Sequence, residues 1–486
     1  MTTEVAAPTV PIYLAGDFVE AGTPLEVRNP ADGSLIATTF QAGATELERA
    51  VAAAVEAFER TRRLAGYERH DALAHVAACI ERDADELAVL LSRESGKPIR
   101  DARGEVARGA LTFRTAAEEA LRINGEWLPL DWAAANRGRH GIVRRYAIGP
   151  VAGISPFNFP LNLAAHKVAP AIAAGCSIVL KPPSKDPLSM LRIAGYLAET
   201  DLPAGAVSIL PMDRPTGDAM VSDDRFKLLS FTGSPGVGWK MKAEAGKKKV
   251  VLELGGNAGA IVDETADLDW AVDRLVYGSF AYAGQVCISV QRIYVVRDVY
   301  PEFERRFVER VARVKVGDPL DAETDLGPMV DEEAVRRTDT WVREAVEAGA
   351  RALVRGEPDG RWFGPTVLVD VPRDAMICSE EAFAPVVNLF PVDSFADALR
   401  EINDSRFGLQ CGVFTGSLDH TLAAHDELEV GGIIVNDVPT WRTDAMPYGG
   451  VKDSGLGREG LRWSIEDMTE PRLLAFARTP GGIDRR

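Results

Sequence analysis

Cysteine is scarce in this chain, and its spacing lacks the patterns that give cysteine a structural role. The 486 residues contain only 5 cysteines, at positions 79, 176, 287, 378 and 411, and no two of them form a CxxC pair. This spacing argues against a disulfide framework and against a zinc site, so we expect no metal. A few separate thiols are typical of a reducing compartment, and we therefore expect a cytoplasmic protein.

Basic charge and long apolar runs are lacking as well. The 55 Lys and Arg residues against 72 Asp and Glu give a formal net charge of −17 at pH 7, which argues against nucleic acid or an anionic membrane surface as a partner. The longest nearly apolar run, Val168 to Leu180, is too short to span a bilayer. The first residues, Met1 to Pro11, have no basic or apolar stretch, so we expect no secretory signal.

The first third of the chain is predicted to be mainly helical. Thr45 and Glu48 predict a capping box before a helix that ends near Arg60. Apolar residues at three- and four-residue spacing predict further amphipathic helices from 67 to 94 and from 99 to 124. A strand pair within 126–146 and a lone strand at 472–478 have no covering helix, which is typical of a projecting hairpin that pairs with something else. A self-contained sheet edge is the alternative.

From Gly149 onward, short apolar strands alternate with helical segments. Strands are expected near 151–154, 177–181, 207–210, 227–231 and 249–253, and the alternation resumes after Cys287. This pattern predicts parallel sheets covered on both faces, with ligands outside the carboxyl ends of the strands.

One cysteine stands in a context that favours chemistry. Cys287 follows a small Ala-Gly-Gln run and precedes an apolar strand, and Glu253 ends another strand at Leu-Glu-Leu-Gly-Gly. A thiol nucleophile and a carboxylate base are the two groups that a thioester mechanism needs. An inert buried thiol is the alternative. Nearby, Asn158 follows a strand and opens a helix, where it could cap that helix or donate to a developing oxyanion.

The motifs LELGGN and GQVC, together with FTGS at 231–234 and the EExF segment at 380–383, resemble those of the aldehyde dehydrogenase superfamily. The resemblance extends from Lys97 to Glu470 and is strongest to a bacterial branch of lactaldehyde, phosphonoacetaldehyde and semialdehyde dehydrogenases. It implies an α/β fold with two doubly wound parallel-sheet domains and a small β oligomerisation arm. The expected division is a Rossmann-like NAD(P)-binding domain at 1–131 and 147–252, a catalytic domain at 253–464, and the arm at 132–146 and 465–486.

The resemblance also implies roles for individual residues. Cys287 is the expected nucleophile, Glu253 the base and Asn158 the oxyanion donor, with Lys167 close to them. The expected cofactor residues are Ser155, Phe157, Lys181, Ser184, Gly233, Ser234, Glu381 and Phe383. Ser184 stands where NAD-specific members often have a glutamate, and Lys185 follows it, so either NAD or NADP is the expected cofactor.

Two arginines are expected to bind the substrate. Arg108 belongs to a segment similar to a helix of non-phosphorylating glyceraldehyde-3-phosphate and phosphonoacetaldehyde dehydrogenases, where the matching arginine faces the substrate tail. Arg442 is a second candidate anchor. Alternatively, Arg108 pairs with Glu105 or a neighbouring helix. Glu470 matches a more distant family carboxylate, although a surface salt bridge explains it equally well.

The resemblance therefore implies NAD(P)-dependent oxidation of a short aldehyde with an anionic tail to the free carboxylic acid, in a homodimer or homotetramer. One alternative is a CoA-acylating semialdehyde dehydrogenase, although members of that group typically lack the glutamate found here at 253. Another is a catalytically idle binding protein on the same scaffold, which retention of nucleophile, base and oxyanion donor disfavours.

Overall fold

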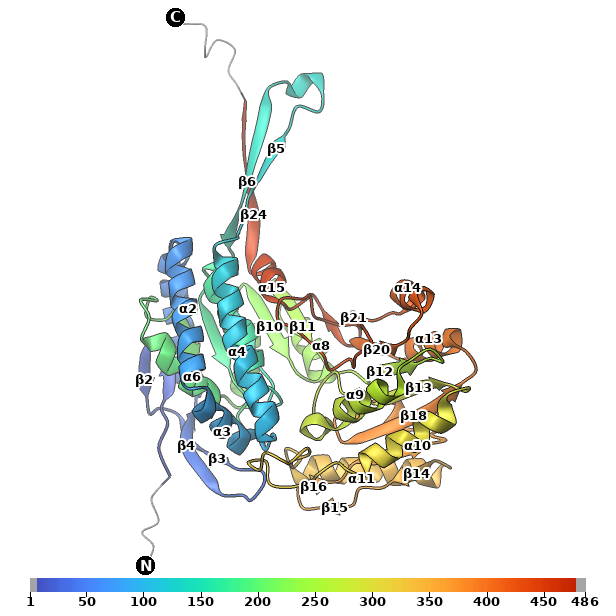
Figure 1. Cartoon of the computed structure of the whole chain (residues 1–486). Coiled ribbons are helices and arrows are strands. Elements are labelled where there is room, and N and C mark those ends of the chain that lie inside the picture. The colour runs from blue at the N-terminus through green and yellow to red at the C-terminus, as the bar shows by residue number, and fades with distance from the viewer. Residues whose placement is uncertain (1–6, 478–486) are drawn as a thin grey trace, which may run out of the picture.

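The chain folds into two α/β lobes and a projecting arm (Figure 1). The structure is a computed structural model that describes residues 7–477. The first lobe contains an eight-stranded sheet in the order β2-β1-β9-β8-β7-β10-β11-β23. Its strands are β1 (Ile12–Leu14), β2 (Asp17–Val19), β7 (Val151–Ile154), β8 (Ile178–Lys181), β9 (Val207–Ile209), β10 (Leu228–Thr232), β11 (Lys249–Glu253) and β23 (Gly455–Leu456).

The second lobe contains a seven-stranded sheet in the order β14-β17-β18-β13-β12-β20-β21. Its strands are β12 (Gly259–Val262), β13 (Arg292–Val296), β14 (Arg351–Val354), β17 (Thr366–Val369), β18 (Val386–Val392), β20 (Gln410–Phe414) and β21 (Gly432–Val435). In this second sheet, neighbouring strands are parallel except at the β14 edge. In the first sheet, the three antiparallel pairings likewise lie toward the edges. The predicted α/β fold class is confirmed.

Helices cover both sheets. Around the first sheet lie α1 (Ala44–Thr61), α2 (Gly66–Arg82), α3 (Ala84–Ser95), α4 (Ile99–Ala120), α5 (Asn162–Ala174), α6 (Leu188–Ala198), α7 (Arg214–Ser222), α8 (Pro235–Glu244) and α15 (Leu461–Asp467). Around the second lie α9 (Leu268–Phe280), α10 (Tyr300–Val311), α11 (Glu332–Glu347), α12 (Met376–Ser379), α13 (Phe395–Asn403) and α14 (Leu418–Glu427). Two-stranded ribbons complete the lobes: β3 (Thr23–Arg28) with β4 (Leu35–Gln41), β15 (Pro358–Asp359) with β16 (Trp362–Phe363), and β19 (Phe407–Gly408) with β22 (Val451–Lys452).

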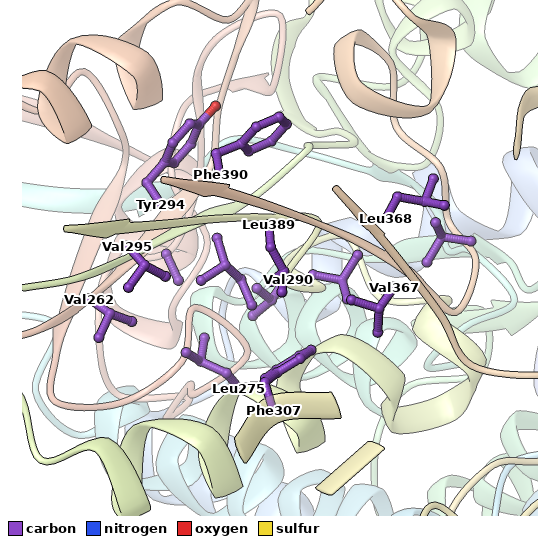
Figure 2. Close-up of a cluster of buried hydrophobic side chains, with 14 of the residues drawn as sticks. Val262, Leu275, Val290, Tyr294, Val295, Phe307, Val367, Leu368, Leu389 and Phe390 are labelled. Carbon is purple, nitrogen blue, oxygen red and sulfur yellow. The ribbon is translucent and has the colours of Figure 1, made fainter. Parts of the chain in front are cut away.

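The core of the second lobe shows why these strands are apolar on both faces. Figure 2 shows the side chains of Val262, Val295 and Leu389 lying together with those of Leu275 and Phe307 from the covering helices. On the same sheet the rings of Tyr294 and Phe390 stack with centroids 5.2 Å apart. Burying such side chains contributes about 1.5–3 kcal/mol each, which fixes the sheet that carries the site loops.

Two predictions in the helical region were wrong in detail. The capping box belongs to Gly43 and Glu46, because the helix begins at Ala44 and the Glu46 carboxylate accepts from the Gly43 backbone N–H at 2.9 Å. The helix predicted over 67–94 is two helices, which meet at Asp83. The Asp83 carboxylate accepts from the Tyr196 hydroxyl at 2.7 Å, a tertiary contact that the local pattern does not reveal.

The arm is a three-stranded antiparallel sheet, in the order β24 (Thr469–Ala477), β6 (Arg139–Ala147), β5 (Glu126–Pro129). It extends away from both lobes in Figure 1. A short 3₁₀ turn, η1 (Ala134–Asn136), lies in its tip. The lone strand predicted at the C-terminus thus pairs with the hairpin, and Arg478 lies outside the described residues. Among residues 7–477, no helix combines the length and apolar composition needed to cross a membrane.

Candidate active site

One cavity of about 770 Å³ gathers most of the residues that the sequence predicted. It is lined by Cys287, Glu253 and Asn158 and by all eight predicted cofactor residues: Ser155, Phe157, Lys181, Ser184, Gly233, Ser234, Glu381 and Phe383. Most of these residues follow the carboxyl ends of β7, β8, β10 and β11, where the parallel topology brings loops together. Lys167, Arg108 and Arg442 do not line this cavity.

Cys287 lies on a loop with an unusual backbone. The preceding 3₁₀ turn, η2 (Ala281–Gly284), has left-handed conformations at Tyr282 (φ 48°), Ala283 (φ 52°) and Gly284 (φ 67°). At Gly284, a Cβ atom would lie 2.1 Å from the carbonyl oxygen of Ala384, so only glycine fits there. Such strain at non-glycine residues costs about 1–3 kcal/mol each and is typical of functional loops.

The Cys287 thiol lies in the cavity against the Tyr448 hydroxyl. Burial raises its pKa to about 11, although the Tyr448 hydroxyl, 3.0 Å from Sγ, acts in the opposite direction. Because the thiolate is the nucleophile, the thiol must lose its proton in order to react.

Glu253 has the properties of a general base. It ends β11, is buried, and neither carboxylate oxygen has a hydrogen-bond partner among residues 7–477. Burial, and then the negative charge of Glu459, raise its pKa well above the ordinary value. An unpartnered buried carboxylate is costly to the fold, and a raised carboxylate pKa suits general base catalysis near neutral pH.

Asn158 is held at the start of α5 without serving as its cap. The first amides of the helix region, those of Leu161 and Asn162, donate to the Glu105 carboxylate at 3.0 and 3.1 Å. Lys97 pairs with Glu105 and donates to the Asn158 backbone carbonyl at 2.7 Å. The Asn158 side chain is thus left for another role, and its buried Oδ1 has no partner within the described chain.

A second buried carboxylate, Glu459, was missed by the sequence interpretation. It accepts from Lys167 Nζ at 3.1 Å, and Lys167 also donates to Thr232 at 2.8 Å and Ser230 at 3.2 Å. Burial opposes ionisation of Glu459, but the charges of Lys167, His166 and Arg442 lower its pKa to about 2. Only the fold reveals this, since Glu459 lies in a glycine-rich loop nearly 300 residues from Lys167.

Glu470, in contrast, is on the surface. Its carboxylate pairs with Lys249 Nζ at 2.7 Å, and both side chains are largely exposed. The salt-bridge interpretation of Glu470 therefore accounts for its position.

The rest of the cavity has features that suit a dinucleotide. Ser234 is the N-cap of α8, whose positive N-terminal end favours phosphate, and the Gly233 amide is held by the Glu253 carbonyl at 3.0 Å. Glu381 accepts from the Gly256 amide at 3.1 Å, and burial raises its pKa to about 7. A Cβ atom on Gly255 would lie 2.1 Å from the Glu381 carboxylate, which explains the first glycine of the LELGG motif.

Five further residues line the part of the cavity that suits the dinucleotide. Phe157 and Phe383 meet edge to face with ring centroids 5.7 Å apart. Burial lowers the pKa of Lys181. Ser184 donates to the Met212 carbonyl at 3.1 Å, and Lys185 pairs with Asp331 at 2.5 Å.

Arg108 and Arg442 belong to a separate charged cluster beside the thiol. The Arg442 guanidinium lies 3.7 Å above the ring of Tyr448, whose hydroxyl contacts Cys287. Arg442 also pairs with Glu459 at 3.4 Å, and its buried Nε has no partner in the part of the chain described. Arg108 pairs with Asp444 at 2.8 Å rather than with Glu105.

His166 joins the two arginines. Its Nε2 lies 2.7 Å from Asp444 and 3.4 Å from Arg442. Burial opposes ionisation of Asp444, but the hydrogen bond from His166 and the charge of Arg108 hold the pKa of that carboxyl below its usual range. No sequence motif singled out His166, Asp444 or Tyr448 as a site residue, because their partners lie far away in the chain: Asp444 contacts α4 and α5, and Tyr448 contacts Cys287.

A thiol, an unpartnered buried carboxylate and a cavity with features that suit a dinucleotide lie together here, an arrangement typical of nicotinamide-dependent oxidoreductases. The aldehyde dehydrogenase family profile matches residues 18–474, and the chain belongs to this family. It is an NAD(P)-dependent aldehyde oxidoreductase, as the resemblance implied, and NAD or NADP is its cofactor.

Individual relatives support this assignment. A 3-sulfolactaldehyde dehydrogenase of Priestia aryabhattai is 40% identical over 466 residues, covering 96% of this chain and 97% of the relative. The crystal structure of aldehyde dehydrogenase 21 from Physcomitrella patens in complex with the reaction product succinate matches with a TM-score of 0.96 and 46% identity, covering 98% and 100% of the two chains. A glyceraldehyde-3-phosphate dehydrogenase from Methanocaldococcus jannaschii, complexed with NADP, matches with a TM-score of 0.90 and 36% identity over 95% and 100%.

Proposed function

We propose that this protein oxidises a short aldehyde with an anionic tail to the free carboxylic acid. The observation that carries the proposal is that Cys287, Glu253 and Asn158 line one cavity with the nucleotide-binding residues. A charged cluster containing Arg108 and Arg442 lies beside the thiol.

In the proposed reaction, the Cys287 sulfur forms a bond to the aldehyde carbon, the carbonyl π bond breaks toward oxygen, and the thiol proton passes through solvent to that oxygen. The Asn158 side-chain amide and the Cys287 backbone N–H stabilise the negative charge that develops on oxygen, and one such donor is worth about 3–4 kcal/mol. The product is a thiohemiacetal on Cys287. Its oxidation leaves a thioester, and Glu253 then removes a proton from the water that hydrolyses it.

The residues present fit a nicotinamide dinucleotide. Lys181 and Glu381 suit the ribose hydroxyls, the N-terminus of α8 suits the pyrophosphate, and Phe157 and Phe383 flank the cavity. When bound there, the nicotinamide supplies the two-electron acceptor for the aldehyde. A free acid product requires water to reach the thioester, and the retained Glu253 supports hydrolysis over transfer to CoA.

The charges beside Cys287 support an anionic tail. Three cationic side chains, Arg108, Arg442 and Lys167, are paired with only two carboxylates whose pKa values are lowered, Asp444 and Glu459. A carboxylate or sulfonate on the substrate would balance the remaining positive charge, and a guanidinium binds either through paired hydrogen bonds. Of the proteins named above, one is a 3-sulfolactaldehyde dehydrogenase, named for a sulfonated aldehyde, and another holds succinate, a dicarboxylate.

Matched substrate pairs test the proposal. Reduced nicotinamide is followed with sulfolactaldehyde against lactaldehyde, and with succinate semialdehyde against butyraldehyde, since each pair differs mainly in the anionic group. We expect kcat/KM to be about tenfold to a thousandfold higher for the charged members. Equal values within both pairs would refute the anionic tail, and no reduction with any short aldehyde would refute the proposed activity.

A further inference from the structure

Away from the cavity that contains Cys287, three potential metal ligands meet on the outer surface of the first lobe. His75 and Cys79 lie on α2, and Glu199 directly follows α6. His75 Nε2 lies 2.9 Å from Glu199 Oε2 and 3.4 Å from Cys79 Sγ, and Cys79 Sγ lies 3.8 Å from the same carboxylate oxygen.

Local geometry and packing bring the three side chains together. Residues four apart on a helix share one face, which places His75 beside Cys79. The α2 and α6 helices pack on each other, and the Tyr196 hydroxyl on α6 bonds to Asp83 immediately after α2, so the C-terminal end of α6 is held against this face. Cys79 is only 3% exposed, while the side chains of His75 and Glu199 reach the surface.

The separations match one face of a tetrahedral zinc site. Zinc binds thiolate sulfur at about 2.3 Å and histidine nitrogen or carboxylate oxygen at about 2.0–2.2 Å, so tetrahedral ligand atoms lie about 3.3–3.6 Å apart. The observed 2.9, 3.4 and 3.8 Å bracket this range, and one atom from each residue is sufficient. Thiolate, imidazole and carboxylate together favour Zn²⁺ over the hard cations Mg²⁺ and Ca²⁺.

The fourth position of such a site would open to solvent. A surface depression of about 400 Å³ adjoins the cluster and is lined by His75 and Glu199 together with Asp71 and Asp201. Water or one of these carboxylates can complete a tetrahedron there. A thiolate and a carboxylate also balance the two positive charges of the ion.

We propose that His75, Cys79 and Glu199 form a zinc site that links α2 to the end of α6. This differs from the sequence expectation of no metal, which rested on the absence of CxxC pairs. The carboxylate is 124 residues from His75 in the chain, so no local spacing could reveal it. None of the three residues lines the cavity that contains Cys287, which makes the site structural rather than catalytic.

Cobalt titration of the full-length, metal-stripped protein tests the site. Co²⁺ bound by thiolate in a tetrahedral site gives a sulfur-to-metal charge-transfer band and intense visible absorption. We expect about one equivalent of Co²⁺ to produce both signals and Zn²⁺ to abolish them. We also expect Zn²⁺ to raise the midpoint of thermal unfolding, because a ligand that binds the folded state stabilises it.

Five variants separate this cluster from other thiols. Cys79→Ser, His75→Gln and Glu199→Gln should each weaken binding by more than about a hundredfold, since even outer-shell partners of a metal contribute about 10–100-fold. Cys176→Ser, which removes another buried thiol, and Cys287→Ser should keep the cobalt spectrum. Loss of the spectrum only in Cys287→Ser would overturn the proposal, as would its persistence in Cys79→Ser or the absence of any thiolate signal.

Folding of the variants is controlled separately. Thermal unfolding without metal should give similar midpoints for the wild type and Glu199→Gln, because the Glu199 side chain is half exposed. Glu199→Gln therefore remains a valid test even if Cys79→Ser is unstable. If this folded variant binds cobalt like the wild type, the carboxylate is no ligand and the proposed site is wrong.

Discussion

Glu253 and Glu459 are two buried carboxylates of one charge cluster whose pKa values move in opposite directions. Glu459 is ion-paired with Lys167 and Arg442, which lowers its pKa to about 2. Glu253 has no hydrogen-bond partner among residues 7–477, and burial together with the charge of Glu459 raises its pKa. Two carboxylates of one site whose pKa values are shifted apart in this way can have different roles, since one stays charged while the other can take and release protons.

The first prediction separates the nucleophile from the base. Cys287→Ala should abolish aldehyde oxidation and still bind NAD, because the thiol forms the bond to substrate. Glu253→Gln should release about one equivalent of reduced nicotinamide per site and then slow by about 10²–10⁴-fold, the usual contribution of a general base. Rapid-mixing absorbance measures the burst, and normal steady turnover of Glu253→Gln would show that another group removes the proton.

The second prediction concerns stability and pH. The folded pKa of Glu253 lies above its ordinary value of 4.5, so the folded state favours the protonated carboxyl, and this preference destabilises the fold as pH rises through the folded pKa. Glu253→Gln, which carries no charge, should therefore unfold at a higher temperature than the wild type at pH 8. The difference should shrink as pH falls toward 4.5. Thermal melts across this range check the sign, and a less stable variant at pH 8 would contradict it.

The third prediction is a homodimer or homotetramer formed through the arm. Trp132 and Leu474 in the arm are 89% and 63% exposed, more than a solitary folded chain usually tolerates for grouped apolar side chains. Light scattering at micromolar concentration should give a multiple of 52.5 kDa. Leu474→Asp should shift the mass toward the monomer. Leu418→Asp, at a comparably exposed leucine (71%) on α14, should not, and a monomeric wild type would refute the arm interface.

The fourth prediction is that NADP is accepted as well as NAD. Ser184 lines the cavity without a negative charge, so nothing at this position repels a 2′-phosphate. Ser184→Glu should lower kcat/KM for NADP by about tenfold to a hundredfold and leave NAD largely unaffected. Initial rates with both cofactors decide this, and a wild-type enzyme that cannot use NADP would remove the argument from Ser184.

The fifth prediction tests Arg108 as the anchor for the substrate tail. Arg108→Ala should reduce kcat/KM for a charged short aldehyde by about tenfold to a hundredfold, the usual worth of a hydrogen bond between charged groups, and spare an uncharged one. Arg114→Ala, which removes an exposed arginine from the same helix, is the matched control. Equal losses on both substrates would assign Arg108 to the support of Asp444 alone.

The sequence by itself determined the family, the α/β class and the residues that follow strand ends. Cys287, Glu253, Asn158 and the eight cofactor residues lie in short local motifs, and parallel β-strands bring the residues after their carboxyl ends to one side of a sheet. A local pattern therefore predicts which of these side chains face the same cavity.

Only the tertiary structure decided what surrounds those residues. Glu459, Tyr448, Asp444 and His166 carry no distinctive spacing, and each becomes part of the site through a partner far away in the chain. The same holds for Glu199 beside His75 and Cys79, and for the helix break at Asp83. The physical reason is that burial and charge pairing depend on the three-dimensional neighbours of a group. A carboxylate whose pKa is lowered and one whose pKa is raised therefore look alike in the sequence.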